Sequence, residues 1–433
     1  MRKIFLLSCF SLSFAACAAE QAAMFRGDPA HSGVALSAGL PALHGVKWKF
    51  HCRGSVSSPA LSGDSLFVGC DDNKLYALDP ASGAVKWEFK TGGPVASSPA
   101  VTEGLVYIGS YDGAFYAIDA ATGQERWKFA TGGERRFSAP HLHGASPAAE
   151  VMPDPFDFYL SSPVLSGGTV YFGSGDHKIY ALDARTGARK WEFATDQVVH
   201  GSPAVADGVL YAGSWDSRVY ALDAATGREK WRFQAGTDDK IHNQEGFQSS
   251  PAVSGGLVYI GCRDSKLYAL DAKTGHQVWA YDNKGSWVIG SPAIKDGTVY
   301  FATADTGLFH AVDARTGAEK FSVSSNHWPH FSSPVVAGGL VYVGSHQGRM
   351  LAIDIAKERL AWSFDVDAAS RTAAFTGPDG APDYGRLFAS FFYDDVVVGV
   401  NRVRQSGAVL STPLVADGAV YFASADGTVY ALD

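Results

Sequence analysis

The chain has 433 residues, of which 46% are hydrophobic and 18% are charged, and its formal net charge is −8. This acidic balance, without a long basic run, argues against binding to nucleic acid or, by charge, to an anionic membrane surface. The length would suit two or three ordinary domains, but the internal repeat described below overrides that expectation.

Residues 1–19 have the pattern of a secretory signal peptide. Two basic residues are followed by the apolar run 4–14, which is too short to span a bilayer. Two processing routes fit the end of this segment: lipidation of Cys17, which lies in a lipobox-like Phe-Ala-Ala-Cys stretch, or ordinary cleavage after residue 18 or 19. We therefore expect an exported, periplasmic protein without a transmembrane span, which the first route would anchor to the outer membrane by a lipid.

Residues 20–45 form a lead that contains Gly and Pro but little periodicity. We expect it to be a strap that lies across the first or last unit of the repeat that follows.

Residues 46–433 repeat with a period of about 40 residues. Each unit has four apolar or alternating runs of strand length, separated by turn residues, which predicts a four-stranded antiparallel meander. A Ser-Pro or Thr-Pro pair opens each unit, at Pro59, Pro99, Pro163, Pro203, Pro251, Pro292, Pro334 and Pro413. The third run ends 20 residues after the proline in seven units and 21 residues after it in one, at Asp79, Asp119, Asp183, Asp223, Asp271, Asp313, Asp354 and Asp433. This strict period predicts an all-β, eight-bladed propeller.

An aromatic residue follows each of these aspartates, except the last, eight positions later. We interpret the aspartates as turn caps and the aromatics as packing between blades, not as catalytic groups. The eighth unit stops at Asp433 without a fourth strand, whereas residues 46–50 have the Trp-x-Phe form of the other fourth strands. This segment is predicted to complete the last blade and close the ring, which protects the sheet edges.

The repeated pattern Ser-Ser-Pro, Val-Tyr-x-Gly-Ser-x-Asp and Leu-Tyr-Ala-Leu-Asp-Ala-x-Thr-Gly resembles the PQQ-type propeller repeat. The resemblance implies one of two roles. Quinoprotein alcohol dehydrogenases hold pyrroloquinoline quinone (PQQ) and calcium, whereas the propeller lipoprotein of the outer-membrane β-barrel assembly machinery is non-catalytic. The dehydrogenases carry two adjacent cysteines over the quinone, and this chain has none. Their calcium ligands and catalytic aspartate find no matching motif either, so the sequence looks more like the assembly-machinery propeller.

Three cysteines remain beyond the signal segment. Cys52 and Cys70 approach the first blade from the same face, so we expect a disulfide between them, with Cys262 free, against the alternative of three free thiols.

Three connections between blades are longer than the base of about 12 residues, by about 24 after Trp127, 8 after Trp231 and 39 after Trp362. All three are expected on one face, because a fourth strand ends where the next first strand begins. We favour a loop with its own hairpin over a ninth blade for the longest. Residues proposed for this binding face are His141, His143, His200, His242, His327, His330, Arg371, Phe391, Phe392, Tyr393, Arg402 and Arg404.

Three interpretations of this face compete: a protein-partner surface with aromatic and Arg anchors, plain loop packing, or a pocket for a metal, a quinone or another small ligand. We favour the first, and hence a non-catalytic envelope propeller that binds a protein partner, in outer-membrane protein assembly if the resemblance holds. No catalytic residue, metal ligand or cofactor is assigned. The alternatives are a dehydrogenase with PQQ and calcium, and a propeller that binds polysaccharide or another ligand.

Overall fold

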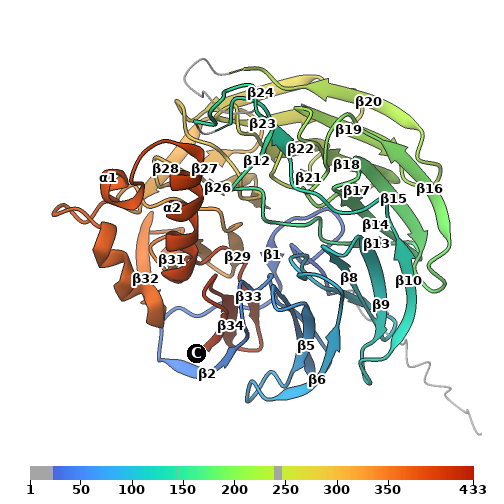
Figure 1. Cartoon of the computed structure of the whole chain (residues 1–433), viewed down its shortest axis with the longest axis horizontal. Helices are drawn as coiled ribbons and strands as arrows, with labels where there is room; N and C mark the ends of the chain where they lie inside the picture. The colour runs from blue at the N-terminus through green and yellow to red at the C-terminus, as the bar shows by residue number, and fades with distance from the viewer. Residues whose placement is uncertain (1–22, 143, 238–245) are drawn as a thin grey trace, which may run out of the picture.

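The computed structural model describes residues 23–142, 144–237 and 246–433. It contains eight blades of four antiparallel strands arranged in a ring, which confirms the eight-bladed propeller (Figure 1). The predicted signal peptide, with Cys17, lies outside the described residues, as do His143 and His242. Among the described helices, none has the length and apolar character needed to cross a membrane.

The first four blades follow one another in chain order. Their strands are β3 (Ala60–Ser62), β4 (Ser65–Cys70), β5 (Lys74–Leu78) and β6 (Val85–Lys90); β7 (Ala100–Thr102), β8 (Leu105–Ser110), β9 (Ala114–Asp119) and β10 (Glu125–Ala130); β13 (Val164–Ser166), β14 (Thr169–Ser174), β15 (Lys178–Asp183) and β16 (Arg189–Ala194); β17 (Ala204–Ala206), β18 (Val209–Gly213), β19 (Arg218–Asp223) and β20 (Glu229–Gln234).

Blades five to eight continue around the ring, and the last takes its outer strand from the start of the chain. Their strands are β21 (Ala252–Ser254), β22 (Leu257–Gly261), β23 (Lys266–Asp271) and β24 (Gln277–Asp282); β25 (Ala293–Lys295), β26 (Thr298–Ala302), β27 (Leu308–Asp313) and β28 (Glu319–Ser324); β29 (Val335–Ala337), β30 (Leu340–Ser345), β31 (Arg349–Asp354) and β32 (Arg359–Asp365); β33 (Leu414–Ala416), β34 (Ala419–Ala423), β35 (Thr428–Leu432) and β2 (Val46–His51).

The repeated aspartates and tryptophans have the structural roles that the sequence suggested. Asp79 Oδ1 accepts the backbone N–H groups of Ala81 and Ser82 at 3.0 and 2.8 Å. Trp87 Nε1 donates to the Ala120 carbonyl of the next blade at 3.0 Å. Its ring lies against Gly123, where a Cβ atom would be only 2.8 Å from it and where φ is +72°. The glycine of each Thr-Gly turn therefore makes room for the neighbouring blade's aromatic ring.

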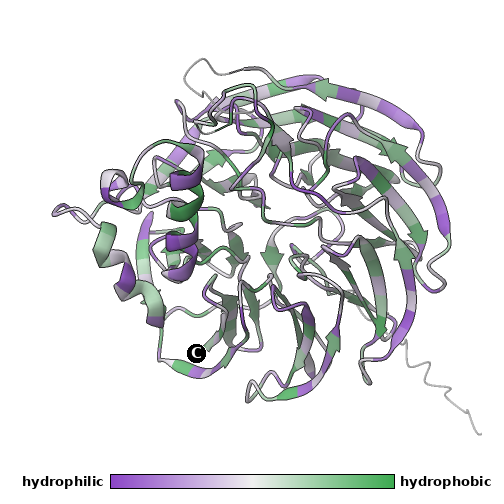
Figure 2. Cartoon of the chain, in the orientation of Figure 1, coloured by the Kyte–Doolittle hydropathy of each residue, from purple (hydrophilic) through white to green (hydrophobic). Residues whose placement is uncertain are grey.

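Ring closure occurs in blade eight, as predicted. Strand β2 pairs antiparallel with β35, and Trp48 lies opposite Ala431. Trp48 is buried and its Nε1 donates to the Pro80 carbonyl of blade one at 2.9 Å. Inner strands are coloured mainly hydrophobic in Figure 2, whereas the outer strands alternate. Each inner strand is thus enclosed by its neighbours, and each outer strand has one face exposed to solvent.

The lead reaches the last blade, as expected, where Ser37 Oγ donates to the Val415 carbonyl at 3.0 Å. Most of it, however, runs along the inner strands of other blades at the centre of the ring. It contributes β1 (Val34–Ala35), which pairs in parallel with β29. Arg26 donates to the carbonyls of Pro334 and Pro292 at 2.5 and 2.7 Å, and burial lowers its pKa to about 9. The inner strands leave backbone groups unpaired at the axis, and the lead satisfies them across several blades.

The third insertion is mainly helical, and the hairpin expected from the sequence is limited to one tight antiparallel turn. It contains η1 (Asp367–Phe375), α1 (Tyr384–Leu387) and α2 (Tyr393–Gln405), and its bridge between Thr376 and Pro382 is a single isolated pair. In α2 the buried Val396, Val400 and Val403 recur at helical spacing on one face. The helix lies over the ring on the left of Figure 1.

Candidate functional site

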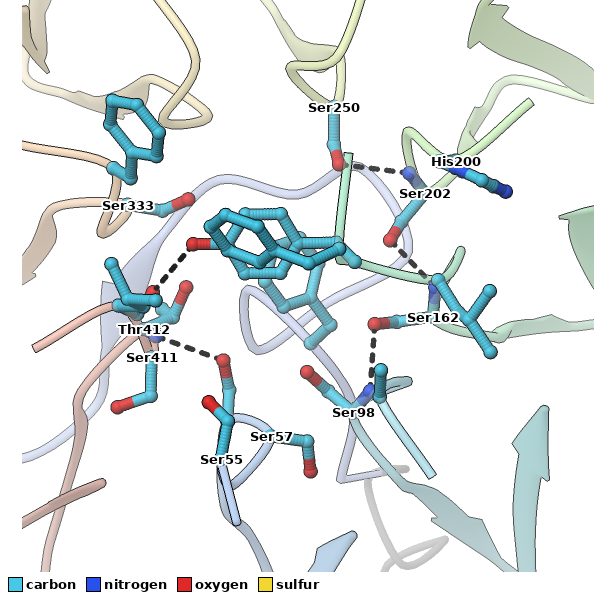
Figure 3. A pocket seen from close by; sticks show the side chains of 18 of the residues that line it. Ser55, Ser57, Ser98, Ser162, His200, Ser202, Ser250, Ser333, Ser411 and Thr412 are labelled. Carbon is cyan, nitrogen blue, oxygen red and sulfur yellow. Dashed lines mark hydrogen bonds between the residues drawn. The ribbon is translucent and has the colours of Figure 1, made fainter. Parts of the chain in front are cut away.

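The Ser-Pro dipeptides form a hydrogen-bonded belt around the channel (Figure 3). In six of the eight dipeptides, the serine before the proline accepts the backbone N–H of the corresponding residue in the preceding blade. Six such bonds, of 2.8 to 3.0 Å, join Ser98 to Ser162, Ser162 to Ser202, Ser202 to Ser250, Ser250 to Ser291, Ser291 to Ser333 and Thr412 to Ser58. The serines are therefore committed to holding the blades together.

The channel inside this belt is narrowed by side chains of the lead and of the first insertion. Phe25 of the lead lines it together with Phe158 and Tyr159 of the first insertion, and the remaining space is about 80 Å³. This space holds a few waters but no organic cofactor. The channel axis is therefore not a ligand site.

The first insertion packs on blades four and five through buried, paired charges. Its segment includes β11 (Ser138–Ala139) and β12 (Met152–Pro153). Asp154 accepts from Arg263 Nη1 at 2.8 Å, and the Arg263 guanidinium lies over the rings of Trp287 and Trp215 at 3.8 and 4.7 Å. Both charged side chains are fully buried. This insertion is thus a fixed platform.

His200 belongs to the same buried layer and is not on the surface of the binding face. Its Nδ1 lies 2.7 Å from Asp157 Oδ1, and its Nε2 lies 3.7 Å from Glu134. Burial opposes protonation of His200, but the two carboxylates outweigh it and raise the pKa to about 10. His200 is therefore a buried cation with structural partners.

The other proposed histidines divide between surface and interior. His141 and His327 are exposed and adopt positive φ angles of 63°. His330 is buried, with Nδ1 2.8 Å from the Gly344 carbonyl and Nε2 2.8 Å from Ser325 Oγ. Burial lowers the pKa of His330 to about 4. The structure does not bring these histidines together.

The three proposed arginines hold the helical insertion in place. Arg371 Nη1 donates to the Gln405 carbonyl at 2.8 Å, and Arg402 Nη1 donates to the carbonyls that end α1 at 3.3 Å. Arg404 forms an ion pair with Asp71 of blade one at 2.9 Å. Their guanidinium groups already have partners within this protein.

Phe391 and Phe392 form an exposed aromatic patch on the insertion face, with 78% and 64% of their surface accessible. Tyr393 fixes the patch, because its hydroxyl donates to the Pro153 carbonyl of the first insertion at 2.6 Å. Gly144 packs so closely against the Phe391 carbonyl that a Cβ atom there would lie 2.0 Å from it. The two insertions thus meet and present the patch on a fixed base.

A cavity of about 440 Å³ lies between the helical insertion and blades six and seven, and Phe156 and Phe158 of the first insertion complete its wall. Its walls are largely aromatic and include Trp287, Trp328, Phe331, Tyr384 and Phe388. Asp305, Arg404 and His346 also line it. Sequence analysis overlooked Asp305, although one signal existed: the single 21-residue spacing, from Pro292 to Asp313, includes the turn that carries it.

The cavity does not fit the quinone cofactor that the PQQ-type repeat suggests. PQQ carries three carboxylates, but the lining offers one guanidinium, Arg404, which is paired with Asp71, and one carboxylate, Asp305, which would repel them. Calcium requires six to eight oxygen ligands. Within the described residues, the one cluster with metal-ligand spacing is Cys52, Cys70 and Asp72. Its two cysteines are joined in the expected disulfide, while Cys262 is free and buried.

Comparisons with known proteins agree with the propeller architecture. A family model described as outer membrane protein assembly factor BamB matches residues 44–152 and 154–286.

Solved structures with the same fold include BamB from Moraxella catarrhalis, which is 17% identical, with a TM-score of 0.60 over 89% of this chain and 97% of that one. A europium-containing methanol dehydrogenase is 16% identical, with a TM-score of 0.66 over 96% and 98% of the two chains. Quinohemoprotein alcohol dehydrogenase from Comamonas testosteroni is 15% identical, with a TM-score of 0.65 over 97% and 81%. No curated protein matches the sequence. At these identities the structural matches establish the fold alone.

Proposed function

Because this chain belongs to the PQQ-type repeat family of the outer membrane protein assembly factor BamB, we propose that it is a non-catalytic propeller that binds a protein partner of the cell envelope. The binding surface is the face with the three insertions. By the same proposal the protein is exported to the periplasm, with Cys17 as the site of a lipid anchor to the outer membrane.

The observation that carries this proposal is the aromatic patch of Phe391 and Phe392. Large aromatic side chains are usually buried on folding, and leaving two neighbouring rings exposed is costly unless a partner covers them. The patch does not plug the mouth of the ring, because both rings are mostly accessible. Asp394 and Asp395 follow directly and give the patch an acidic border. An apolar centre with a charged rim is the usual arrangement of a protein interface.

The opposite face carries Thr-Gly turns and short glycine turns that recur from blade to blade. Such similar tips cannot easily define a single specific site. Among the described residues of the lead, Leu36 is exposed as a single large apolar side chain, without an aromatic neighbour in sequence. The insertions break the symmetry of the ring, so specificity is best placed there.

A photo-crosslinking amino acid at position 398, an exposed position on α2, tests the proposal in intact cells. We expect a discrete adduct with an envelope protein, and we expect the F391S/F392S double variant to reduce that adduct strongly. A crosslinker at Arg185, on an exposed Thr-Gly turn of blade three, is the matched control and should give no such adduct. An adduct that is unaffected by the double substitution, or that forms equally from position 185, would contradict the proposal.

The dehydrogenase alternative has its own test. Adding PQQ and calcium to the purified protein should give neither cofactor absorbance nor alcohol-dependent dye reduction. Turnover in that assay would show that the protein is a quinoprotein enzyme.

A further inference from the structure

The turn between the second and third strands differs between two sets of blades. In blades one to five an aspartate in this turn accepts a hydrogen bond from a tyrosine four residues later. The pairs are Tyr76 with Asp72, Tyr116 with Asp112, Tyr180 with Asp176, Tyr220 with Asp216 and Tyr268 with Asp264. The same bond repeats in five blades, so it is a structural element of the repeat.

Blade six has kept the aspartate and lost the tyrosine. Its turn has one extra residue, and His310 occupies the position of the tyrosine on the third strand, where it lies 2.8 Å from Glu319. Asp305 makes no hydrogen bond or ion pair with any residue that the structure describes. It is accessible and lines the 440 Å³ cavity. A carboxylate that is structural elsewhere in the ring is thus free to face the cavity.

Asp305 is also the unbalanced charge of this site. Arg404 is neutralised by Asp71 at 2.9 Å, and Arg263, which lies behind Trp287, is neutralised by Asp154 at 2.8 Å. His346 is uncharged at neutral pH, because burial and the neighbouring His330 lower its pKa to about 3. When Asp71 and Asp154 are counted together with the two arginines, Asp305 is the one described charged group at the cavity without an ion-pair partner. Burial raises the pKa of Asp305, and the positive charge of Arg263 opposes this shift.

The walls suit an organic cation. Trp287, Trp328, Phe331 and Phe388 present aromatic rings, and the negative faces of such rings attract ammonium and guanidinium groups. The molecule already uses this attraction in the same place, since Arg263 lies 3.8 Å above the Trp287 ring. The volume falls in the range of ordinary small-molecule sites.

We propose that this cavity binds a small organic cation, an amine or quaternary ammonium compound with an apolar body, with Asp305 as its counter-ion and the aromatic walls around its apolar part. The hydroxyl of Tyr384 and Nε2 of His346 have no hydrogen-bond partner in the described part of the chain. They offer neutral contacts for a hydroxyl or amide on the ligand. This inference is independent of the proposed function, because it requires no partner protein at the aromatic patch.

Phenyltrimethylammonium is the probe, and tert-butylbenzene is its neutral isostere. We expect one molecule of the cation to bind per chain in isothermal titration calorimetry and to change the tryptophan fluorescence. The D305N variant should weaken binding of the cation by about tenfold or more, since a close charge pair contributes at least this much. It should leave binding of tert-butylbenzene unchanged.

Two controls keep the test specific. D207N removes one charge from an exposed turn of blade four on the opposite face and should leave the affinity for the cation unchanged. W328F removes one fluorescent tryptophan from the cavity wall, so it should reduce the fluorescence change.

Absence of stoichiometric binding at millimolar cation, or equal affinity of the cation for wild type and D305N, would overturn the proposal. The patch residues Phe391 and Phe392 remain unchanged in these variants, so failure here leaves the partner-binding proposal untouched.

Discussion

The two long insertions cover different parts of the ring and contact it in different ways. The first insertion, over blades four and five, packs through buried groups that are paired, such as Arg263 with Asp154 and His200 with Asp157. The helical insertion, over blades six to eight, instead covers a cavity. Buried polar atoms without a hydrogen-bond partner among the described residues occur under both insertions, for example Arg263 Nη2 under the first and the Tyr384 hydroxyl under the helical one.

The blades under the two insertions also differ in the hydrogen bonding of the turn between the second and third strands. Blades one to five keep the aspartate–tyrosine bond of the turn, whereas blades six to eight have lost it. Asp305 faces the cavity, Gln347 occupies the turn of blade seven, and Asp426 accepts from Ser424 instead. A polar group that loses its structural partner is costly unless something else satisfies it. We infer that the first insertion is the structural part of the face and that the helical insertion, with its cavity and patch, is the functional part.

The largest expected effect on stability is at the interface between blade eight, which β2 completes, and blade one. If the differences between blades six to eight and the other blades are confined to the insertion face, the interface between blades eight and one should contribute as much to stability as any other interface between blades. Trp48→Ala should therefore lower the free energy of unfolding by about 3–5 kcal/mol, because a buried ring and its hydrogen bond are lost. Trp87→Ala, at an internal seam, is the comparison, and chemical denaturation measures both. A loss below about 1 kcal/mol for Trp48→Ala would show that β2 does not close the ring cooperatively.

The buried histidines under the two insertions should respond to pH in opposite directions. The folded pKa of His200 is about 10, above its unfolded value, so its stabilisation is complete below about pH 6.5 and is lost as the pH rises toward 10. The folded pKa of His330 is about 4, below its unfolded value, so its contribution is lost as the pH falls from about 6.5 toward 4.

Thermal unfolding of wild type and H200Q between pH 7 and 10 measures the first of these effects. We expect the melting temperature of the wild type to fall more steeply with rising pH than that of H200Q. Parallel slopes would mean that His200 does not hold its proton in the folded state.

The aspartate–tyrosine hydrogen bond in the turn of blades one to five can be tested by removing a single hydroxyl group. Tyr220→Phe removes a donor 2.7 Å from Asp216 and should destabilise the protein by about 1–3 kcal/mol. Tyr384→Phe removes a hydroxyl without a described partner and should change stability by less than about 0.5 kcal/mol. Equal losses in urea denaturation would remove the distinction between the two regions.

The smallest expected effect is at the aromatic patch. F391S/F392S should change the free energy of unfolding by no more than about 0.5 kcal/mol, because both side chains are mostly exposed. A large drop in melting temperature would make the patch a structural element of the helical insertion.

The candidate site was only partly visible in the sequence. The spacing of the fourth-strand aromatics and prolines placed the insertions on one face, and the patch of Phe391 and Phe392 followed from their composition. The buried positions of His200 and His330 did not, because burial depends on which insertion packs over which blade. Helix α2 carried a usable signal, since Val396, Val400 and Val403 are spaced by four and three residues. The length of the insertion, close to one repeat, instead raised the question of a ninth blade, and a loop with its own hairpin was preferred because the repeat residues are missing.

The sequence by itself determined the number of blades, the turn caps, the packing of each tryptophan on the next blade and the closure of the ring by residues 46–50. These features arise from interactions repeated at a fixed spacing, so the pattern itself records them. Only the tertiary structure decided that the lead lies in the channel and that its Leu40 carbonyl accepts a hydrogen bond from Trp362 Nε1. The cavity was also decided there, since Asp305, Trp328 and Tyr384 come from three separate segments that meet only when the helical insertion folds over the ring.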